Sequence, residues 1–69
     1  MNVYTINAIG YRKVGITIVA APDRETAKKL AQLNSPDLDY HDPEAIEELP
    51  LTYHGPEGGR ILHTFEVEG

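Results

Sequence analysis

The chain has 69 residues, enough for one domain near the lower size at which a chain folds without disulfides or a metal. It contains no cysteine, so neither disulfides nor thiolate metal sites stabilise it. Its formal net charge of −5 divides into +3 for residues 1–29 and −8 for residues 30–69, and this acidity disfavours direct binding to the phosphates of nucleic acids.

Two segments with alternating side chains open the chain. Residues 3–9 and residues 14–20 are rich in β-branched residues, which favour strands. The connection between them, Gly10–Lys13, is short, so the pattern predicts a β-hairpin. The sides expected to face inward are Tyr4, Ile6 and Ala8 in the first strand and Val14, Ile16, Ile18 and Ala20 in the second.

A helix is predicted next, over residues 23–34. Ala27 and Ala31 fall on one side of it, and these small side chains would let the helix lie close to the sheet. Asp23 is the expected N-cap, because its carboxylate can accept hydrogen bonds from the free amides of the first turn. The pair Ser35–Pro36 should end the helix.

A second, short helix is expected from Asp42, which can cap it, to Pro50, which would end it. Residues 61–68 then predict a last strand whose apolar face would point inward. Residues 51–54 add a short fourth strand, expected to pair with that last strand across a glycine-rich loop. The apolar positions are Ala45, Ile46 and Leu49 in the helix and Ile61, His63, Phe65 and Val67 in the strand.

The order β-β-α-(short α)-β predicts an α+β fold and a single domain over residues 1–69. We expect a small two-layer sandwich, with a mainly antiparallel sheet of three to four strands and the main helix on one face. The open face of the sheet would be half apolar and a docking surface. Its expected residues are Thr5, Asn7, Thr17, Thr64 and Glu66, with Val3, Ile9, Val19 and Leu62 among them.

Residues 37–48, with six carboxylates in twelve positions, are the candidate contact segment. The carboxylates match the first, third and twelfth positions of a calcium-binding EF-hand loop, but Asp42 stands where that loop needs glycine, so calcium binding is rejected. A polar turn with capping aspartates and an acidic surface for a basic partner both remain open. The predicted partner-binding residues are Asp37, Asp39, Tyr40, Asp42, Glu44, Glu47, Glu48 and Tyr53.

Other polar clusters support weaker hypotheses. Tyr11, Arg12 and Lys13 at the hairpin tip form a secondary contact site that could stack on an acidic partner. His54 and His63 lack the local spacing of a zinc site and could meet only in space. The sequence contains no recognisable nucleophile–base pair, so we expect a non-enzymatic protein with no catalytic residues and no cofactor.

The strand VGITIVAA leading into the capped helix DRETAKKLAQLN resembles the same junction in small phage and prophage accessory proteins. That class includes anti-CRISPR-like inhibitors of host defence, many of them small and acidic. The resemblance covers residues 14–34 and carries no catalytic residues. It implies a phage-borne inhibitor that occupies the surface of a basic host protein.

Three functions therefore stay open. The first is an acidic protein-binding module that inhibits or modulates a basic host protein and mimics nucleic-acid phosphates. The second is a structural homo-oligomer, such as a homodimer, that assembles through the open sheet face or an edge strand. The third is a small metal- or ligand-binding protein that uses His54 and His63. No apolar run of about 18 residues and no charged-then-apolar leader is present, so we expect a cytoplasmic protein without a membrane partner.

Overall fold

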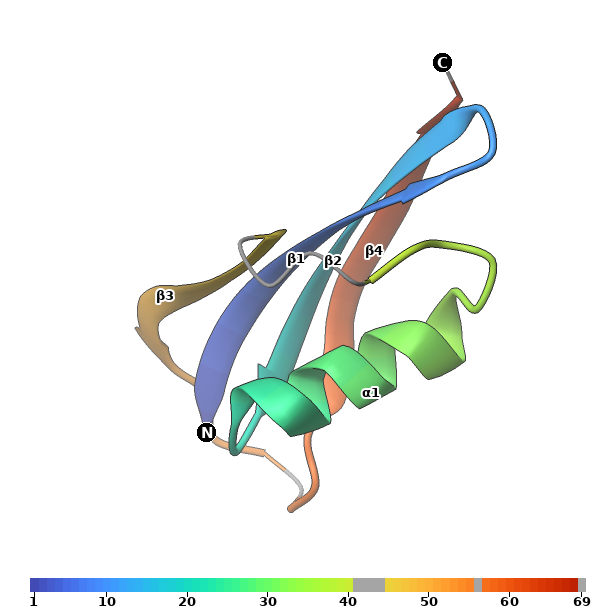
Figure 1. Cartoon of the computed structure of the whole chain (residues 1–69). Coiled ribbons are helices and arrows are strands. Elements are labelled where there is room, and N and C mark those ends of the chain that lie inside the picture. Colours follow the sequence, from blue (N-terminus) through green and yellow to red (C-terminus); the bar gives the residue numbers. More distant parts are fainter. Residues whose placement is uncertain (41–44, 56, 69) are drawn as a thin grey trace.

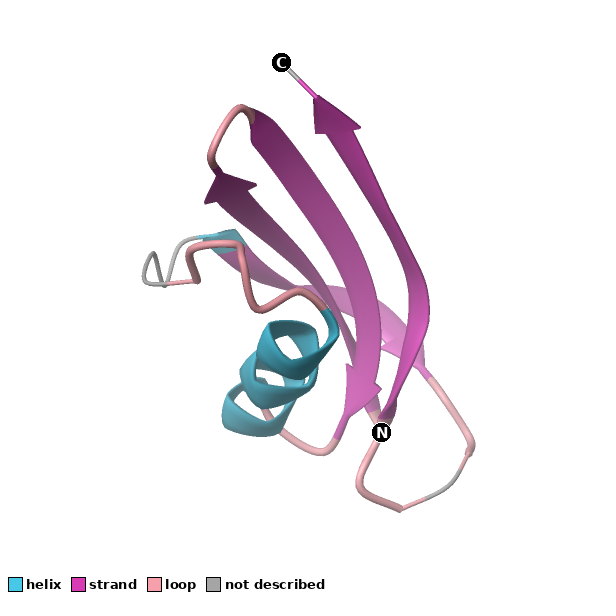
Figure 2. Cartoon of the chain, turned by 90° about the vertical axis from the view of Figure 1, so that its right-hand side faces the viewer, coloured by secondary structure: helices cyan, strands magenta, loops and turns pink. Residues whose placement is uncertain are grey.

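In a computed structural model the chain forms four strands and one helix: β1 (Asn2–Gly10), β2 (Lys13–Ala21), α1 (Arg24–Asn34), β3 (Ile46–Thr52) and β4 (Arg60–Glu68). The structure describes residues 1–40, 45–55 and 57–68. The strands form one antiparallel sheet in the order β3-β1-β2-β4, and α1 packs against one of its faces (Figure 1; Figure 2). The prediction of a small α+β fold with a four-stranded antiparallel sheet and one main helix is confirmed. The predicted order of elements is not.

The hairpin and the helix form as the sequence predicts. Gly10 lies opposite Lys13, so two residues make the turn between β1 and β2. The carboxylate of Asp23 accepts a hydrogen bond from the amide of Thr26 at 2.7 Å, which caps α1. The amide of Ser35 donates to the carbonyl of Ala31 at 2.9 Å and closes the last turn. These local signals therefore define the first half of the fold.

The short second helix is a wrong prediction for residues 46–49, because β3 begins at Ile46. Ile46 is buried opposite Ile6 of β1, and its carbonyl accepts a hydrogen bond from the Arg24 guanidinium at 3.0 Å. The edge of β1 offers this segment backbone partners and a place in the core, which outweighs its local helix signals. Asp42 and Pro43, the expected helix start, lie outside the described residues.

The pairing of the last two strands also differs from the prediction. β3 pairs with β1 and β4 pairs with β2, so residues 51–54 do not pair with the last strand. Leu51 and Thr52 belong to the end of β3. Pro50 falls within an irregularity of the β1–β3 ladder, between the pairs Val3–Leu49 and Asn2–Thr52. Because proline has no backbone N–H to donate, such an irregularity on an edge strand suits it.

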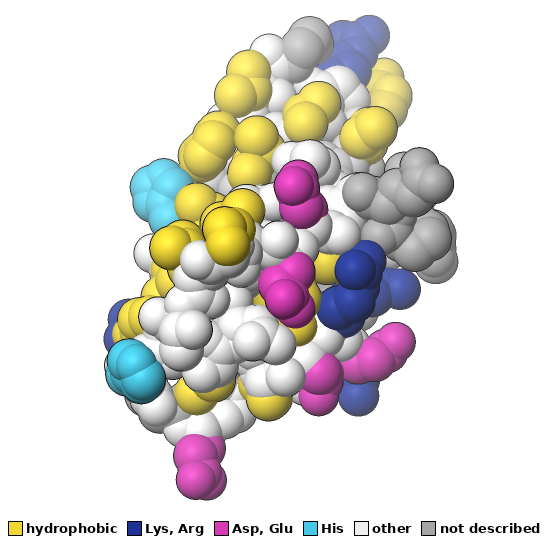
Figure 3. All heavy atoms as spheres, turned by 90° about the vertical axis from the view of Figure 1, so that its left-hand side faces the viewer, with side chains coloured by type: hydrophobic (Ala, Val, Ile, Leu, Met, Phe, Trp, Pro, Cys, Tyr) yellow, Lys and Arg dark blue, Asp and Glu magenta, His cyan; other side chains and the backbone are white. Residues whose placement is uncertain are grey.

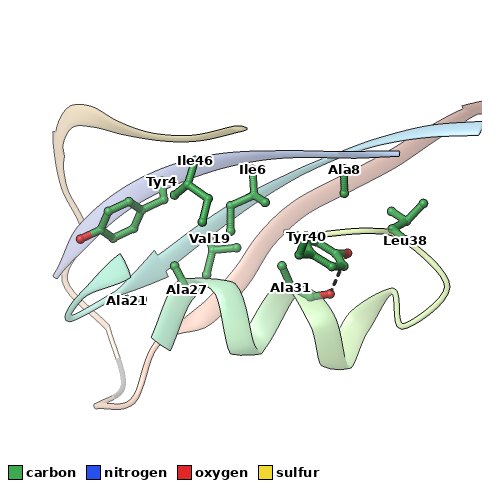
Figure 4. Close-up of a cluster of buried hydrophobic side chains, with 10 residues drawn as sticks. All are labelled: Tyr4, Ile6, Ala8, Val19, Ala21, Ala27, Ala31, Leu38, Tyr40 and Ile46. Atoms are coloured by element: carbon green, nitrogen blue, oxygen red, sulfur yellow. Dashed lines mark hydrogen bonds between the residues drawn. The ribbon is translucent and has the colours of Figure 1, made fainter. Parts of the chain in front are cut away.

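The core lies between α1 and the sheet, where side chains from every layer converge (Figure 4). Ala27 and Ala31 of the helix are fully buried, as the sequence predicts for a helix that lies close to the strands. The loop after the helix adds Leu38 and Tyr40 to the same core. The core cluster consists of Tyr4, Ile6, Ala8, Val19, Ala21, Ala27, Ala31, Leu38, Tyr40 and Ile46.

The face of β2 that covers the core is the opposite of the predicted one. Thr17 and Val19, expected on the open face, are buried under the helix, because they lie opposite Ile6 and Tyr4 of β1. The core side of β2 carries small residues, and Gly15 leaves no room for a side chain: a Cβ there would lie 2.5 Å from Leu38 Cδ1. The larger apolar residues of β2 are therefore left for the open face.

A one-residue irregularity at Leu62 divides β4. His63 lies opposite Ile18, whereas Ile61 lies opposite Val19, so Leu62 is the extra residue. Side chains alternate along a strand, so this extra residue moves Ile61 to the core side and leaves His63, Phe65 and Val67 on the open face, with Thr64 and Glu66 on the core side. The predicted inward face of the last strand is therefore right for Ile61 and wrong for His63, Phe65 and Val67.

Candidate functional site

The predicted acidic contact segment does not form one surface in the described residues. Asp37 and Asp39 are exposed on the loop after α1, whereas Glu47 and Glu48 are exposed on β3. Glu47 lies opposite Thr5 and Glu48 opposite Tyr4, so these two carboxylates point to opposite faces of the sheet. Asp42 and Glu44 lie outside the described residues.

Tyr40 is a core residue, although the sequence pattern suggested a contact residue. Its side chain is 5% exposed, and its hydroxyl donates to the carbonyl of Ala31 at 3.0 Å (Figure 4). Burial raises the pKa of this hydroxyl above its ordinary value. Tyr40 is therefore not accessible to a partner.

Tyr53 is half-buried and fixes the start of the chain. Its backbone amide donates to the Met1 carbonyl at 2.9 Å, and its carbonyl accepts from the amino terminus at 2.9 Å. Its hydroxyl accepts from the Arg60 guanidinium at 3.5 Å. These contacts give Tyr53 a structural role and leave part of its side chain accessible.

At the predicted secondary contact site, Lys13 holds the hairpin to its neighbours. Its ammonium donates to the carboxylate of Asp37 and, at 3.4 Å, to that of Glu66. The hydrogen bond to Lys13 lowers the pKa of Asp37, and the same bond raises the pKa of Lys13. Tyr11 and Arg12 are exposed at the turn, with the guanidinium 5.3 Å from the centre of the tyrosine ring. Only these two remain open to a partner.

His54 and His63 do not come together with a third metal ligand among the described residues. His63 lies on β4 beside Phe65, with ring centres 5.6 Å apart and planes tilted by 48°. His54 follows β3 and is exposed. Over residues 1–40, 45–55 and 57–68, no group of three His, Cys, Asp or Glu side chains is placed to hold a metal ion.

The open face of the sheet is the strongest surface feature of the molecule. Near the hairpin end, Ile9, Val14 and Val67 lie side by side across β1, β2 and β4, and they are 67%, 46% and 60% exposed. The next row is Asn7, Ile16 and Phe65, of which Phe65 is 44% exposed.

The row beyond these is Glu47, Thr5, Ile18 and His63, across all four strands. We call this surface, from Ile9 and Val14 to Glu47 and His63, the open face. In Figure 3 hydrophobic side chains gather over the upper part and the left-hand margin of the molecule, beside a histidine. Charged side chains lie mainly on the opposite side of that view.

The sequence pattern predicts this surface only in part. Alternation placed Ile9 and Asn7 on the open face correctly, because β1 has only one apolar side that could fill the core. It misplaced β2, both of whose sides are apolar. It also misplaced most of β4, because no residue type marks Leu62 as an extra residue. Glycine at position 15 was the available clue, since a position without a side chain suits the side that other groups pack against closely.

Comparisons of this chain with protein-family models, with curated proteins and with solved structures find no match. Within the described ranges, no helix has the length and apolar character needed to cross a membrane.

Proposed function

We propose that this chain is a small, non-enzymatic protein-binding module whose contact surface is the open face of the sheet. One observation carries the proposal: three neighbouring strands expose aligned rows of Ile, Val and Phe side chains on the side away from the helix. Contiguous apolar patches of this kind mark interaction sites, because apolar surface gains free energy when it leaves water.

The pattern of polar residues around the open face supports binding to a protein. Thr5 and Asn7 lie among the apolar side chains, and Glu47 and His63 lie at its two lateral edges. An apolar centre with polar groups at its rim is the usual anatomy of a protein–protein interface. The exposed aromatic ring of Phe65 lies within it, and aromatic side chains are common anchors in such interfaces.

A photo-crosslinking experiment tests this function. Benzoylphenylalanine replaces Phe65 in one variant and Leu33 in the other, and both are irradiated in cells that naturally produce the chain. Leu33 is the matched control because it is 81% exposed on the helix, away from the open face. We expect a discrete adduct from position 65 and none from position 33. No adduct at position 65, or the same adduct from both positions, would contradict the proposal.

The acidic surface is a second candidate, as an inhibitor of a basic host protein of the phage-borne type. The net charge of −5 supports it, and so do the exposed carboxylates of Glu47 and Glu48, one on each face of the β3 edge. Its test is the charge-reversed variant E47K/E48K, which should lose binding to the basic partner. Binding by the unmodified chain should weaken as salt rises. Binding that neither the reversal nor salt alters would exclude this candidate.

A further inference from the structure

We infer that the partner of the open face is a second copy of this chain, packed face to face so that the two sheets form a β-sandwich with the helices outside. This inference rests on the proposed function and names its partner. It depends on the size of the face, on the placement of its few charges, and on the character of the sheet edges.

The size of the open face sets the strength of such a dimer. β1, β2 and β4 have nine residues each and β3 has seven, so the whole sheet spans at most roughly 19 by 30 Å. This agrees with molecular extents of 34 × 20 × 16 Å. The next row, with Val3 and Ala20, is buried, so the open face is smaller than the sheet. Standard interfaces bury about 800 Å² on each partner, so two open faces bury less than this and form a weak dimer.

Two charged side chains are complementary between two copies, Glu47 at the β3 edge of the open face and Arg60 on β4 just beyond it. Glu47 lies on the β3 edge, whereas His63 lies at the β4 edge of the same row and Arg60 one row further on. A two-fold axis parallel to the strands, between β1 and β2, places β3 of one copy over β4 of the other. Each Glu47 then faces the His63 and Arg60 side of the second copy, and apolar rows meet apolar rows between them.

Both edges of the sheet oppose association side by side. β3 exposes Glu47 and Glu48 and contains Pro50, which cannot donate a backbone hydrogen bond. β4 exposes Glu66 and Glu68, so pairing two β4 edges would bring carboxylates of both copies close together. Face-to-face packing avoids these contacts.

Sedimentation velocity with matched variants tests the inference. We expect the chain of 7.6 kDa to sediment as a dimer at micromolar concentration. V14K and V67K place a charge in the apolar row of the open face nearest the hairpin and should raise the dimer dissociation constant at least about tenfold. L33K adds the same charge on the helix and should leave the dimer intact. Circular dichroism confirms that each variant is folded, and folded V14K and V67K dimers as tight as the unmodified chain would overturn the inference.

Chemical crosslinking then separates face-to-face from edge-to-edge pairing. Because the chain has no cysteine, V14C carries a single thiol. Face-to-face packing brings the two thiols together across the interface, so a short bismaleimide should link them. In an edge-to-edge dimer through β4, three strand spacings separate them by about 14 Å along the sheet. L33C, the control, should not crosslink, and a dimer in which V14C also fails to link would overturn face-to-face packing.

The outcomes also separate this inference from the proposed function. If the unmodified chain is monomeric and benzoylphenylalanine at position 65 yields an adduct with a different protein, the inference of a dimer is wrong and the proposed function stands. If position 65 yields no adduct and the chain is monomeric, both are wrong. An adduct of twice the chain mass, lost in V14K, supports both.

Discussion

At the scale of single residues, the hydroxyl of Tyr40 connects the loop after the helix to the carbonyl of Ala31 inside the core. We expect Y40F to lower the free energy of unfolding by about 1 kcal/mol at pH 7, because a buried acceptor loses its donor. Burial raises the pKa of Tyr40 in the folded chain, so its neutral form stabilises the fold below the unfolded pKa of about 10. This contribution of Tyr40 to the free energy of unfolding is lost as pH rises above 10.

Urea unfolding of the unmodified chain and of Y40F, at neutral pH and above pH 10, measures this effect. The difference between the two should shrink at high pH, because Y40F has no hydroxyl to ionise at this position. The other three tyrosines are common to both chains and cancel in the comparison. A difference that grows with pH would show that the hydroxyl is not buried as described.

Asp23 gives a second prediction at this scale. The amide of Thr26 donates to its carboxylate and lowers the pKa of Asp23. A carboxylate of this kind stabilises the fold above the unfolded pKa of about 4, and the contribution is lost as pH falls through the lower folded pKa. D23A should therefore lower the melting temperature at pH 7, because the amide loses its acceptor.

D23S is the matched control, because serine also caps a helix but carries no titrating group. At pH 7 the melting temperature of D23S should be close to that of the unmodified chain. On acidification below pH 4 the melting temperature of D23S should fall less than that of the unmodified chain. Melting curves recorded from pH 2 to pH 7 compare the three proteins. Equal acid sensitivity of D23S and the unmodified chain would mean that the Asp23 carboxylate has no stabilising charge.

At the scale of elements, the extra residue Leu62 determines which side chains of β4 reach the open face. Deletion of Leu62 should preserve the pairs Ile61–Val19 and His63–Ile18 and give a regular ladder. We expect this deletion to change the free energy of unfolding by no more than about 1 kcal/mol, because Leu62 is 37% exposed and lies outside the core cluster. Chemical denaturation measures the change.

Deletion of Thr64 is the control for the same strand. It removes the contact between the Thr17 and Thr64 hydroxyl oxygens, 3.2 Å apart, and moves His63 to the core side beside Thr17. We expect a larger loss of stability from it than from deletion of Leu62. The reverse order would mean that the irregularity lies elsewhere in β4.

The same strands show how far the sequence predicts this fold. The hairpin, the Asp23 cap and the end of α1 at Ser35 follow from local chemistry, and each forms as predicted. β3 does not, because its pairing with β1 depends on residues forty to fifty positions away in the chain. The register of β4 likewise depends on β2, so no local pattern could assign its faces.

At the scale of the whole molecule, the structure differs from the sequence prediction more in the candidate site than in the fold. The sequence indicated both an acidic segment and a half-apolar sheet face. Burial of Tyr40 and the opposed directions of Glu47 and Glu48 weaken the first, whereas Ile16 and Ile18 of β2, next to Phe65 and His63, make the second more apolar than predicted. Which strand side faces water is a tertiary property, and composition alone could not provide it.

Association through the open face predicts a melting temperature that depends on protein concentration. A dimer stabilises the folded state by mass action, so the melting temperature should rise as the chain is concentrated. V14K should show a weaker dependence, and L33K should match the unmodified chain. Scanning calorimetry over a hundredfold range of concentration measures this, and equal behaviour of all three proteins would contradict association through the open face.

The sheet order also places the two halves of the sequence in space. The hairpin from the basic half occupies the centre of the sheet, and the strands from the acidic half form both borders. Repulsion between the border carboxylates of neighbouring molecules therefore opposes lateral growth of the sheet. High salt screens this repulsion, and acid removes it by protonating the carboxylates. Precipitation on mild acidification would then begin at these borders, while the interior of each molecule is still folded.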